Sequence, residues 1–303
     1  MSTWIVNDKL TCIPGTKTFW HMLLEIDGTV DKSGHNFNQI VAKIDADKGF
    51  ADLIIRNASW FPRLARKEKT IAFFQDLPRD ARKDDVVFNA DCVVFNSHYT
   101  LGAYQNDLDK IKRYEVIPIG VNGKIFTPYQ PCLTRFAQSG PTTGIFVGDY
   151  NATKNTKTFE GVARHRKDLR FFYVSKAGHR INLPNVNNIV GGVGEAEMAD
   201  LYNESDFVIM CSPVETLHLS SIEGAMCDKP VVGTRTGWLA DYFSDTAGVI
   251  VDDIESIDEY SKAIDSIFDN REAFGPKAHM ETTSFTWENC KATWRKLIEE
   301  MAT

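Results

Sequence analysis

Short apolar runs alternate with helical stretches along the whole chain, and this alternation restricts the possible fold more than any other feature. Eleven runs read as buried strands, at residues 4–6, 51–56, 69–74, 91–97, 114–120, 143–150, 169–175, 187–192, 206–212, 229–234 and 247–253. Strands that alternate with helices pair into parallel sheets covered by those helices. The pattern therefore predicts an α/β protein.

The eleven runs fall into two groups, separated by residues 121–143, which hold three prolines and no clear period and read as a linker. A chain of 303 residues is long enough for two cores of about 150 residues each. We therefore expect two Rossmann-like domains facing across a cleft, with ligands at the carboxyl ends of the strands. The expected division is an N-terminal domain, a linker, a C-terminal domain and a final helix that returns to the N-terminal domain, at residues 1–127, 128–142, 143–283 and 284–303.

Several classes of protein are not indicated by the sequence. No apolar run approaches the roughly 18 residues of a membrane span, and the start MSTWIVNDKLT lacks the apolar stretch of a signal peptide. The six cysteines are scattered without a C-x-x-C pair, which favours reduced thiols over a disulfide frame or a zinc site. These features predict a cytoplasmic protein, for which peripheral contact with a membrane surface stays open.

Charge is distributed unevenly along the chain. Residues 1–127 hold 17 basic and 16 acidic side chains, whereas residues 128–303 hold 17 and 25. Within the first part, residues 56–83 carry eight basic and three acidic side chains with several aromatics between them. One interpretation is a docking surface for an anionic partner, and the other is a solvated face whose aromatic rings turn into the core.

The segment ETLHLSSIE, residues 215–223, places two glutamates around a short turn ahead of a small-residue helix. Ser220 and Glu223 fit an S-x-x-E capping box, which would make Glu223 structural. That interpretation leaves Glu215 unexplained. The alternative is an anion site at the helix N-terminus, where free amides bind phosphate while the carboxylates accept hydrogen bonds from sugar hydroxyls. Such a site suits a nucleotide sugar.

This segment resembles the E-x7-E signature of retaining GT-B glycosyltransferases of family four. EGAMCDKPVV after it is similar to the family's E-A-M-A-x-G-x-P-V-V, and GWLAD to its G-G-x-x-E. IFVGDYNATKN, FNSHYT, VIPIGVNGKIFTP and FTWENC resemble further family elements, so the resemblance covers about residues 90–303.

The resemblance implies a donor domain at the C-terminal side and an acceptor domain at the N-terminal side. It places Glu223 on the nucleotide ribose and Glu215 on the donor sugar, with Lys154 as the lysine that neutralises the leaving diphosphate. Lys154 and Glu215 are the predicted catalytic residues. The predicted donor-binding set is Gly15, Gly148, Lys154, Gly191, Glu215, His218, Leu219, Ser220 and Glu223. Candidate acceptor contacts are Trp60, Arg63, Gln75 and Asp76.

The chain departs from the family pattern at three places. Asp149 stands where an arginine usually follows the strand glycine, so Lys157 or Arg235 would have to substitute for it. The family's E-G-F-G becomes Glu215-Thr-Leu-His218, and its N-domain histidine becomes Gln75.

The predicted function is retaining transfer of a hexosyl or pentosyl group from a nucleotide sugar to an acceptor hydroxyl, with no metal and no cofactor beyond the co-substrate. A glycan or lipid-linked glycan is the expected acceptor, and a hydroxylated base of nucleic acid, held by residues 56–83, is the alternative. Two other hypotheses are a catalytically silent nucleotide-sugar binder and a metal-dependent GT-A enzyme. The last would use a D-x-D triplet, Asp45 with Asp47 or Asp107 with Asp109.

Overall fold

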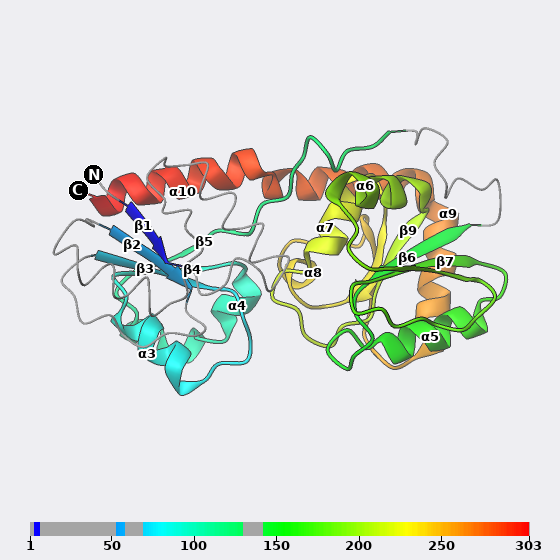
Figure 1. The fold of residues 1–303 in the computed structure, drawn as a ribbon, viewed down its shortest axis with the longest axis horizontal. Coiled ribbons are helices and arrows are strands. Elements are labelled where there is room, and N and C mark those ends of the chain that lie inside the picture. Colours follow the sequence, from blue (N-terminus) through cyan, green and yellow to red (C-terminus); the bar gives the residue numbers. More distant parts are fainter. Residues whose placement is uncertain (1–2, 7–52, 58–68, 130–141, 303) are drawn as a thin grey trace. The chain divides into compact units, whose positions relative to one another are not determined.

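The computed structural model describes residues 3–6, 53–57, 69–129 and 142–302. The chain forms two compact units, each with its own parallel sheet (Figure 1). Met1–Gly120 and Trp287–Thr303 make the first unit, and Val121–Thr286 makes the second. The predicted positions Gly15, Asp45, Asp47, Trp60 and Arg63 lie outside the described residues.

The first unit holds a five-stranded sheet in the order β1-β2-β3-β4-β5, and every pairing in it is parallel. Its strands are β1 (Thr3–Val6), β2 (Leu53–Asn57), β3 (Lys69–Phe74), β4 (Cys92–Phe95) and β5 (Tyr114–Val116). Its described helices are α3 (Ala81–Asn89), α4 (His98–Gly102), the 3-10 helix η1 (Gln105–Lys110) and α10 (Trp287–Ala302).

Both faces of this sheet are covered, because successive residues of a strand point to opposite sides. Phe74 and Phe95 pack with Tyr104 and with the valines of α3 on one face. Phe73 points to the other face, where its ring meets that of Trp294 of α10 edge to face, with the ring centroids 5.9 Å apart. The prediction that the C-terminal helix returns to the N-terminal domain is therefore confirmed.

The second unit holds a six-stranded parallel sheet in the order β11-β10-β9-β6-β7-β8. Its strands are β6 (Thr143–Val147), β7 (Arg170–Ser175), β8 (Val186–Val190), β9 (Phe207–Met210), β10 (Val231–Thr234) and β11 (Gly248–Val251). Its helices are α5 (Thr156–His165), α6 (Glu195–Glu204), α7 (Leu219–Met226), α8 (Trp238–Asp241) and α9 (Ile257–Thr282), followed by the 3-10 helix η2 (Thr283–Phe285).

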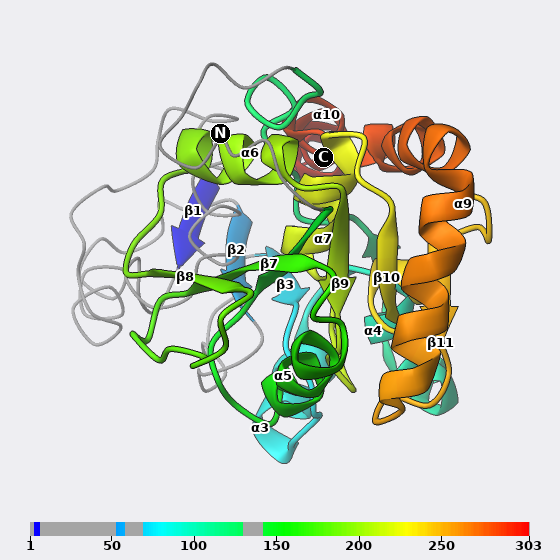
Figure 2. The ribbon, with the colours of Figure 1, turned by 90° about the vertical axis from the view of Figure 1, so that its right-hand side faces the viewer.

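Helices cover this second sheet on both sides as well. Helix α5 and the first half of α9 bury their apolar residues against Phe146, Phe171, Phe207 and Ile209. Helices α6 and α7 lie on the opposite face (Figure 2). A Cβ on Gly224 of α7 would stand 2.3 Å from Val208 of β9, so glycine there lets α7 approach the sheet closely.

The strand order of the second sheet reverses direction between β6 and β9, and this reversal creates a place where a ligand can bind. The chain starts at β6, proceeds through β7 to β8, then returns to the other side of β6 to form β9, β10 and β11. Neighbouring strands β6 and β9 are therefore followed by connections that leave in opposite directions. Open parallel sheets bind ligands at the carboxyl ends of the strands at such a switch point. The loops after β6 and β9 hold Lys154 and Glu215.

All eleven predicted strands are present, and the prediction of two parallel α/β sheets is confirmed. The chain passes between the units twice, after Gly120 and after Thr286. The two passages are paired locally, since Trp287 Nε1 donates to the Gly120 carbonyl at 2.8 Å and the Val121 amide donates to the Phe285 carbonyl at 2.8 Å. Among the described residues, no helix combines the length and the hydropathy that crossing a membrane requires.

Candidate active site

Lys154 and Glu215 meet at the switch point of the second sheet. The Lys154 Nζ lies 2.6 Å from Glu215 Oε1, and only 13% of the Glu215 side chain is exposed. Burial alone would raise the pKa of Glu215, but interactions with His218, Lys154 and Ser212 outweigh it and hold that pKa below its ordinary value. Glu215 is therefore an ionised carboxylate at neutral pH, paired with a cation in a largely buried position.

Gly148 makes room for this lysine. It follows strand β6, and a Cβ at Gly148 would stand 3.0 Å from Lys154 Cγ and 3.2 Å from its Cδ. The aliphatic stem of Lys154 therefore lies over the glycine backbone. The Lys154 amide donates to Asn151 Oδ1 at 2.8 Å, which fixes the loop ahead of α5. Loop and glycine together direct the ammonium group toward Glu215.

Asp149, which replaces the expected arginine, has a structural role. Its Oδ1 accepts hydrogen bonds from the Ser175 hydroxyl and from the amides of Lys176 and Ala177, at 2.8 to 2.9 Å. Burial would raise the pKa of Asp149, yet these donors hold it below the ordinary value. The carboxylate thus closes the turn after β7 and satisfies amides that an arginine could not serve. Among the described residues, neither Lys157 nor Arg235 forms a hydrogen bond or ion pair with Lys154 or Glu215.

The loop after β9 enters helix α7 through an unusual cap. His218 is the N-cap residue, in the left-handed region with φ 64° and ψ 68°, and its Nδ1 accepts from the Ser221 amide. The helix starts at Leu219, so Ser220 is its second residue and not its cap. The capping-box interpretation of Glu223 is therefore wrong, because Glu223 is the fifth residue of the helix, two positions beyond the one from which a capping-box glutamate reaches the cap.

Glu223 instead pairs with Tyr202 of α6. The Tyr202 hydroxyl donates to Glu223 Oε2 at 3.0 Å. Burial raises the pKa of Glu223 to about 8, the Tyr202 hydrogen bond opposes that rise, and Glu195 adds to it. Glu223 is thus protonated at neutral pH, whereas Glu215 is ionised. The two glutamates of the E-x7-E segment are in opposite charge states.

The remaining predicted donor residues surround this edge of the sheet. Leu219 and Ser220 are partly exposed at the start of α7, and their amides donate to no acceptor in the part of the chain that the structure describes. Gly191 follows β8 with φ 104°, and its amide donates to the Ser175 carbonyl at 3.0 Å. No heavy atom lies within 4 Å of the position that a Cβ of Gly191 would take, so the space beside this glycine at the end of β8 is open.

Gln75 and Asp76 belong to the first unit, where they directly follow strand β3. Gln75 is buried, and Asp76 is partly exposed with its carbonyl accepting from Lys83 Nζ at 3.0 Å. Both residues therefore lie at the carboxyl end of a strand of the first sheet, and contact with an acceptor stays a prediction for them.

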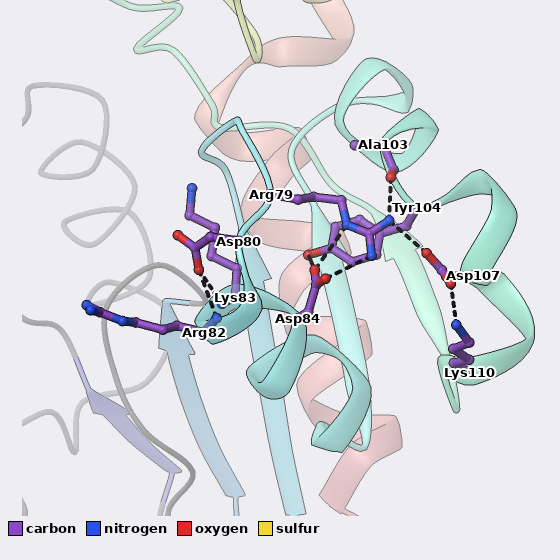
Figure 3. Close-up of polar contacts among 9 residues, drawn as sticks. All are labelled: Arg79, Asp80, Arg82, Lys83, Asp84, Ala103, Tyr104, Asp107 and Lys110. Atoms are coloured by element: carbon purple, nitrogen blue, oxygen red, sulfur yellow. Dashed lines mark hydrogen bonds and ion pairs between the residues drawn. The ribbon is translucent and has the colours of Figure 1, made fainter.

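The described part of the basic stretch 56–83 is mostly engaged in the fold. Arg79 bonds Asp84, Asp107 and the Ala103 carbonyl, and its guanidinium lies 3.9 Å from the centre of the Tyr104 ring (Figure 3). These contacts raise its pKa, with the Asp84 hydrogen bond as the largest cause. Lys83 is buried, and its Nζ donates to the carbonyl oxygens of Asp76 and Pro78. Phe73 and Phe74 are core residues. The interpretation of a solvated face with buried aromatics therefore fits these residues better than a polyanion surface.

The same network bears on the D-x-D alternative. The Asp107 carboxylate accepts hydrogen bonds from both Arg79 and Lys110 (Figure 3). Both of its oxygens are therefore paired with side-chain cations, which disfavours Asp107 as a metal ligand. Among the described residues no group of three or more His, Cys, Asp or Glu side chains is arranged to hold a metal ion.

Solved structures with similar folds agree with the two-sheet architecture. Sucrose-phosphate synthase from Thermosynechococcus elongatus superimposes with a TM-score of 0.75 at 18% identity, over 96% of this chain and 81% of that one. Anabaena HepE in complex with UDP-glucose superimposes with a TM-score of 0.77 at 13% identity, over 99% of this chain and 100% of that one. The chain has the GT-B fold. This architecture has two sheet cores, unlike the single core of the GT-A alternative.

Sequence comparisons find glycosyltransferases that are similar to part of this chain. Residues 171–280 of this GT-B chain match the family model described as Glycosyl transferases group 1. A D-inositol 3-phosphate glycosyltransferase from Paenarthrobacter aurescens is 27% identical over 214 residues, which cover 62% of this chain and 51% of that protein. The chain thus spans about half the length of this relative. Both comparisons show what part of this chain is similar to: a glycosyl transferases group 1 model over residues 171–280, and a glycosyltransferase over 214 residues.

Some residues of the site were not assigned a role from the sequence. Trp238 lies in the segment GWLAD, which resembles a family motif, and Tyr202 lies in α6, but neither residue type by itself indicates a hydrogen bond to a particular partner. Their roles depend on packing between elements far apart in the chain, which brings Tyr202 of α6 to Glu223 and Trp238 of α8 to Ser221.

Proposed function

We propose that this protein transfers a sugar from a nucleotide-sugar donor to an acceptor hydroxyl, with retention of configuration. The contact between Lys154 and Glu215 at the switch point carries the proposal. A cation and an ionised carboxylate lie together at the edge where such sheets bind ligands, which supports roles for them in binding a diphosphate and sugar hydroxyls. Retention is supported by the resemblance of the Glu215–Glu223 spacing to the E-x7-E of retaining enzymes.

In the proposed reaction the acceptor oxygen forms a bond to the anomeric carbon while the bond from that carbon to the diphosphate breaks. The acceptor proton passes to the departing phosphate oxygen on the same face. Negative charge therefore grows on the diphosphate, and Lys154 with the amides of Leu219 and Ser220 stabilises it. Glu215 orients the donor sugar, and Glu223 binds the nucleotide ribose. Positive charge from the protein means that the proposed step needs no metal ion.

The donor we propose to test first is a UDP-linked hexose, because a solved structure of this fold holds UDP-glucose. The acceptor we propose is a glycan or lipid-linked glycan hydroxyl. A polyol phosphate deserves inclusion in the panel, since a relative is named a D-inositol 3-phosphate glycosyltransferase.

The test combines a thermal-shift screen of UDP-, GDP-, ADP- and CDP-linked sugars with turnover assays on the donors that bind. We expect Lys154→Ala to lower kcat/KM by about 10²- to 10³-fold while donor affinity changes much less. Lys167→Ala is the matched control, because Lys167 is exposed in the loop that precedes β7, at the opposite edge of the sheet. Binding without any turnover would overturn the enzymatic proposal and favour a donor-binding protein.

A further inference from the structure

A buried hydrogen-bond chain links α8 to the cap of α7. Trp238 is fully buried, and its Nε1 donates to Ser221 Oγ at 2.6 Å. Ser221 Oγ lies 2.7 Å from His218 Nδ1 and 3.0 Å from the His218 carbonyl oxygen. The Ser221 amide also donates to His218 Nδ1, at 3.3 Å. The chain therefore ends on one nitrogen of the His218 ring.

The donors in this chain determine where the ring proton lies. An indole N–H and a backbone N–H can only donate. The Ser221 amide points at His218 Nδ1 and can only donate, which favours that nitrogen as the unprotonated acceptor. The Ser221 hydroxyl contacts both His218 Nδ1 and the His218 carbonyl oxygen, and it can donate its proton to either of them. Burial lowers the pKa of His218 to about 4, so the ring is neutral at neutral pH. The single ring proton is then on Nε2, since a neutral imidazole has one donor and one acceptor nitrogen.

The backbone of His218 has an energetically unfavourable, left-handed conformation. A left-handed conformation costs a residue with a side chain about 1–2 kcal/mol, so surrounding contacts must maintain it. Those contacts come from the start of α8. The Trp238 amide donates to the Leu217 carbonyl at 3.3 Å, and Gly237, with φ 56°, fits so closely that a Cβ would stand 2.9 Å from the Leu217 carbonyl carbon.

We infer that Trp238 is a positioning residue for the donor site. Acting through Ser221, it holds His218 in the neutral form with the proton on Nε2, beside the ionised Glu215. The ring then offers the donor an uncharged hydrogen bond to an oxygen, and the loop is ordered before the donor arrives. Pre-ordering lowers the entropic cost of binding. This inference rests on the proposed function, since it assigns a role within the same site.

Trp238→Phe tests the inference, because it keeps a buried ring and removes the indole N–H. Trp294→Phe is the matched control, since Trp294 is equally buried but lies in the first unit. We expect Trp238→Phe to weaken donor binding about tenfold by calorimetry and to raise KM more than it lowers kcat, whereas Trp294→Phe changes donor affinity less than twofold.

A spectroscopic measurement separates positioning from simple loss of stability. Nitrogen-15 NMR of histidine-labelled protein, with His218→Asn to identify the signal, should show the neutral form protonated on Nε2. Trp238→Phe should give a mixture of the two neutral forms. Ser221→Ala retains the tryptophan and removes the linking hydroxyl, so it keeps the test decisive if Trp238→Phe does not fold.

Two kinds of failure are distinguishable in this design. If the unsubstituted protein binds none of the four nucleotide sugars, the proposed function is overturned and the role of Trp238 falls with it. If the protein binds a donor, but Trp238→Phe and Ser221→Ala bind it equally well, the positioning role alone is overturned. A ring protonated on Nδ1 in the unsubstituted protein would also contradict the inference.

Discussion

Glu215 and Glu223 show how position decides the charge of a carboxyl group. Both are glutamates of one nine-residue segment, and burial acts to raise the pKa of each. Glu215 has a lysine 2.6 Å away, so it remains ionised. Glu223 has a neutral phenol as its partner, so it keeps its proton at neutral pH. An ionised group suits the recognition of sugar hydroxyls, whereas a neutral group at Glu223 avoids adding a second negative charge to a site proposed for a diphosphate.

This difference predicts opposite effects of two equivalent substitutions on stability. The pKa of Glu223 rises from 4.5 to about 8 on folding, so the native protein retains a proton that the unfolded chain loses across that pH window. Stability from this group is therefore lost as pH rises from about 4.5 to 8. Glu223→Gln should remove the loss and raise the unfolding free energy by up to about 4–5 kcal/mol at pH 8.5, and by less than about 1 kcal/mol at pH 5.

Glu215→Gln is the internal control for that measurement. The pKa of Glu215 is lowered, so its contribution is present above the unfolded pKa and disappears as pH falls through the folded pKa. The substitution should lower the melting temperature at pH 7 and 8.5, with a smaller effect toward pH 4. Melting curves from pH 4 to 9 give both results. Parallel curves for Glu223→Gln and the unsubstituted protein would show that Glu223 does not titrate in this range.

At the scale of elements, patterns predicted the strands but not the junctions between them. Apolar runs marked all eleven strands because burial on both faces of a parallel sheet requires continuous apolar sequence. The start of α7 was predicted less well, since S-x-x-E is a local signal and a histidine can cap a helix in its place. The role of Asp149 likewise depends on the turn after β7, whose amides reach it only in the folded sheet. Strand order, and hence the switch point, also depends on contacts distant in sequence.

The junction between α8 and the loop after β9 supplies a prediction at this scale. Gly237 combines φ 56° with backbone atoms of Leu217 where a Cβ would lie, whereas Gly178 has φ 81° and open space around it. Gly237→Ala carries both the backbone strain and a clash with main-chain atoms. Gly178→Ala carries the strain alone, about 1 kcal/mol. We expect Gly237→Ala to cost about 3 kcal/mol and to weaken donor binding, because His218 must shift.

Chemical denaturation of the two alanine variants measures the comparison, with the transition slope checked for two-state behaviour. If the two variants lost the same amount of unfolding free energy, the loop would have to accommodate the new methyl group of Gly237→Ala without an energetic penalty. In that case the contact between Gly237 and Leu217 would not hold the cap of α7 in place.

At the scale of the whole molecule, the described residues proposed to hold the donor all lie in one unit. Lys154, Glu215, His218 and Glu223 belong to Val121–Thr286, whereas α10 completes the core of the other unit. Each unit has a sheet of its own with helices on both faces. A ligand stabilises the part of the protein whose native state forms its site, in proportion to its concentration relative to Kd.

Donor binding should therefore raise the stability of the second unit in preference to the first. At 100 times Kd, a nucleotide sugar should add about 2.7 kcal/mol to the opening free energy of the elements that hold its site. Hydrogen exchange measures this by segment, and we expect protection to increase in β6, β9 and α7 more than in β2, β3 and α10. Lys154→Ala, which keeps most of the affinity, should show the same pattern at a matched multiple of its own Kd. Protection that increased mainly in the first unit would place the donor site there and contradict the assignment of Lys154 and Glu215.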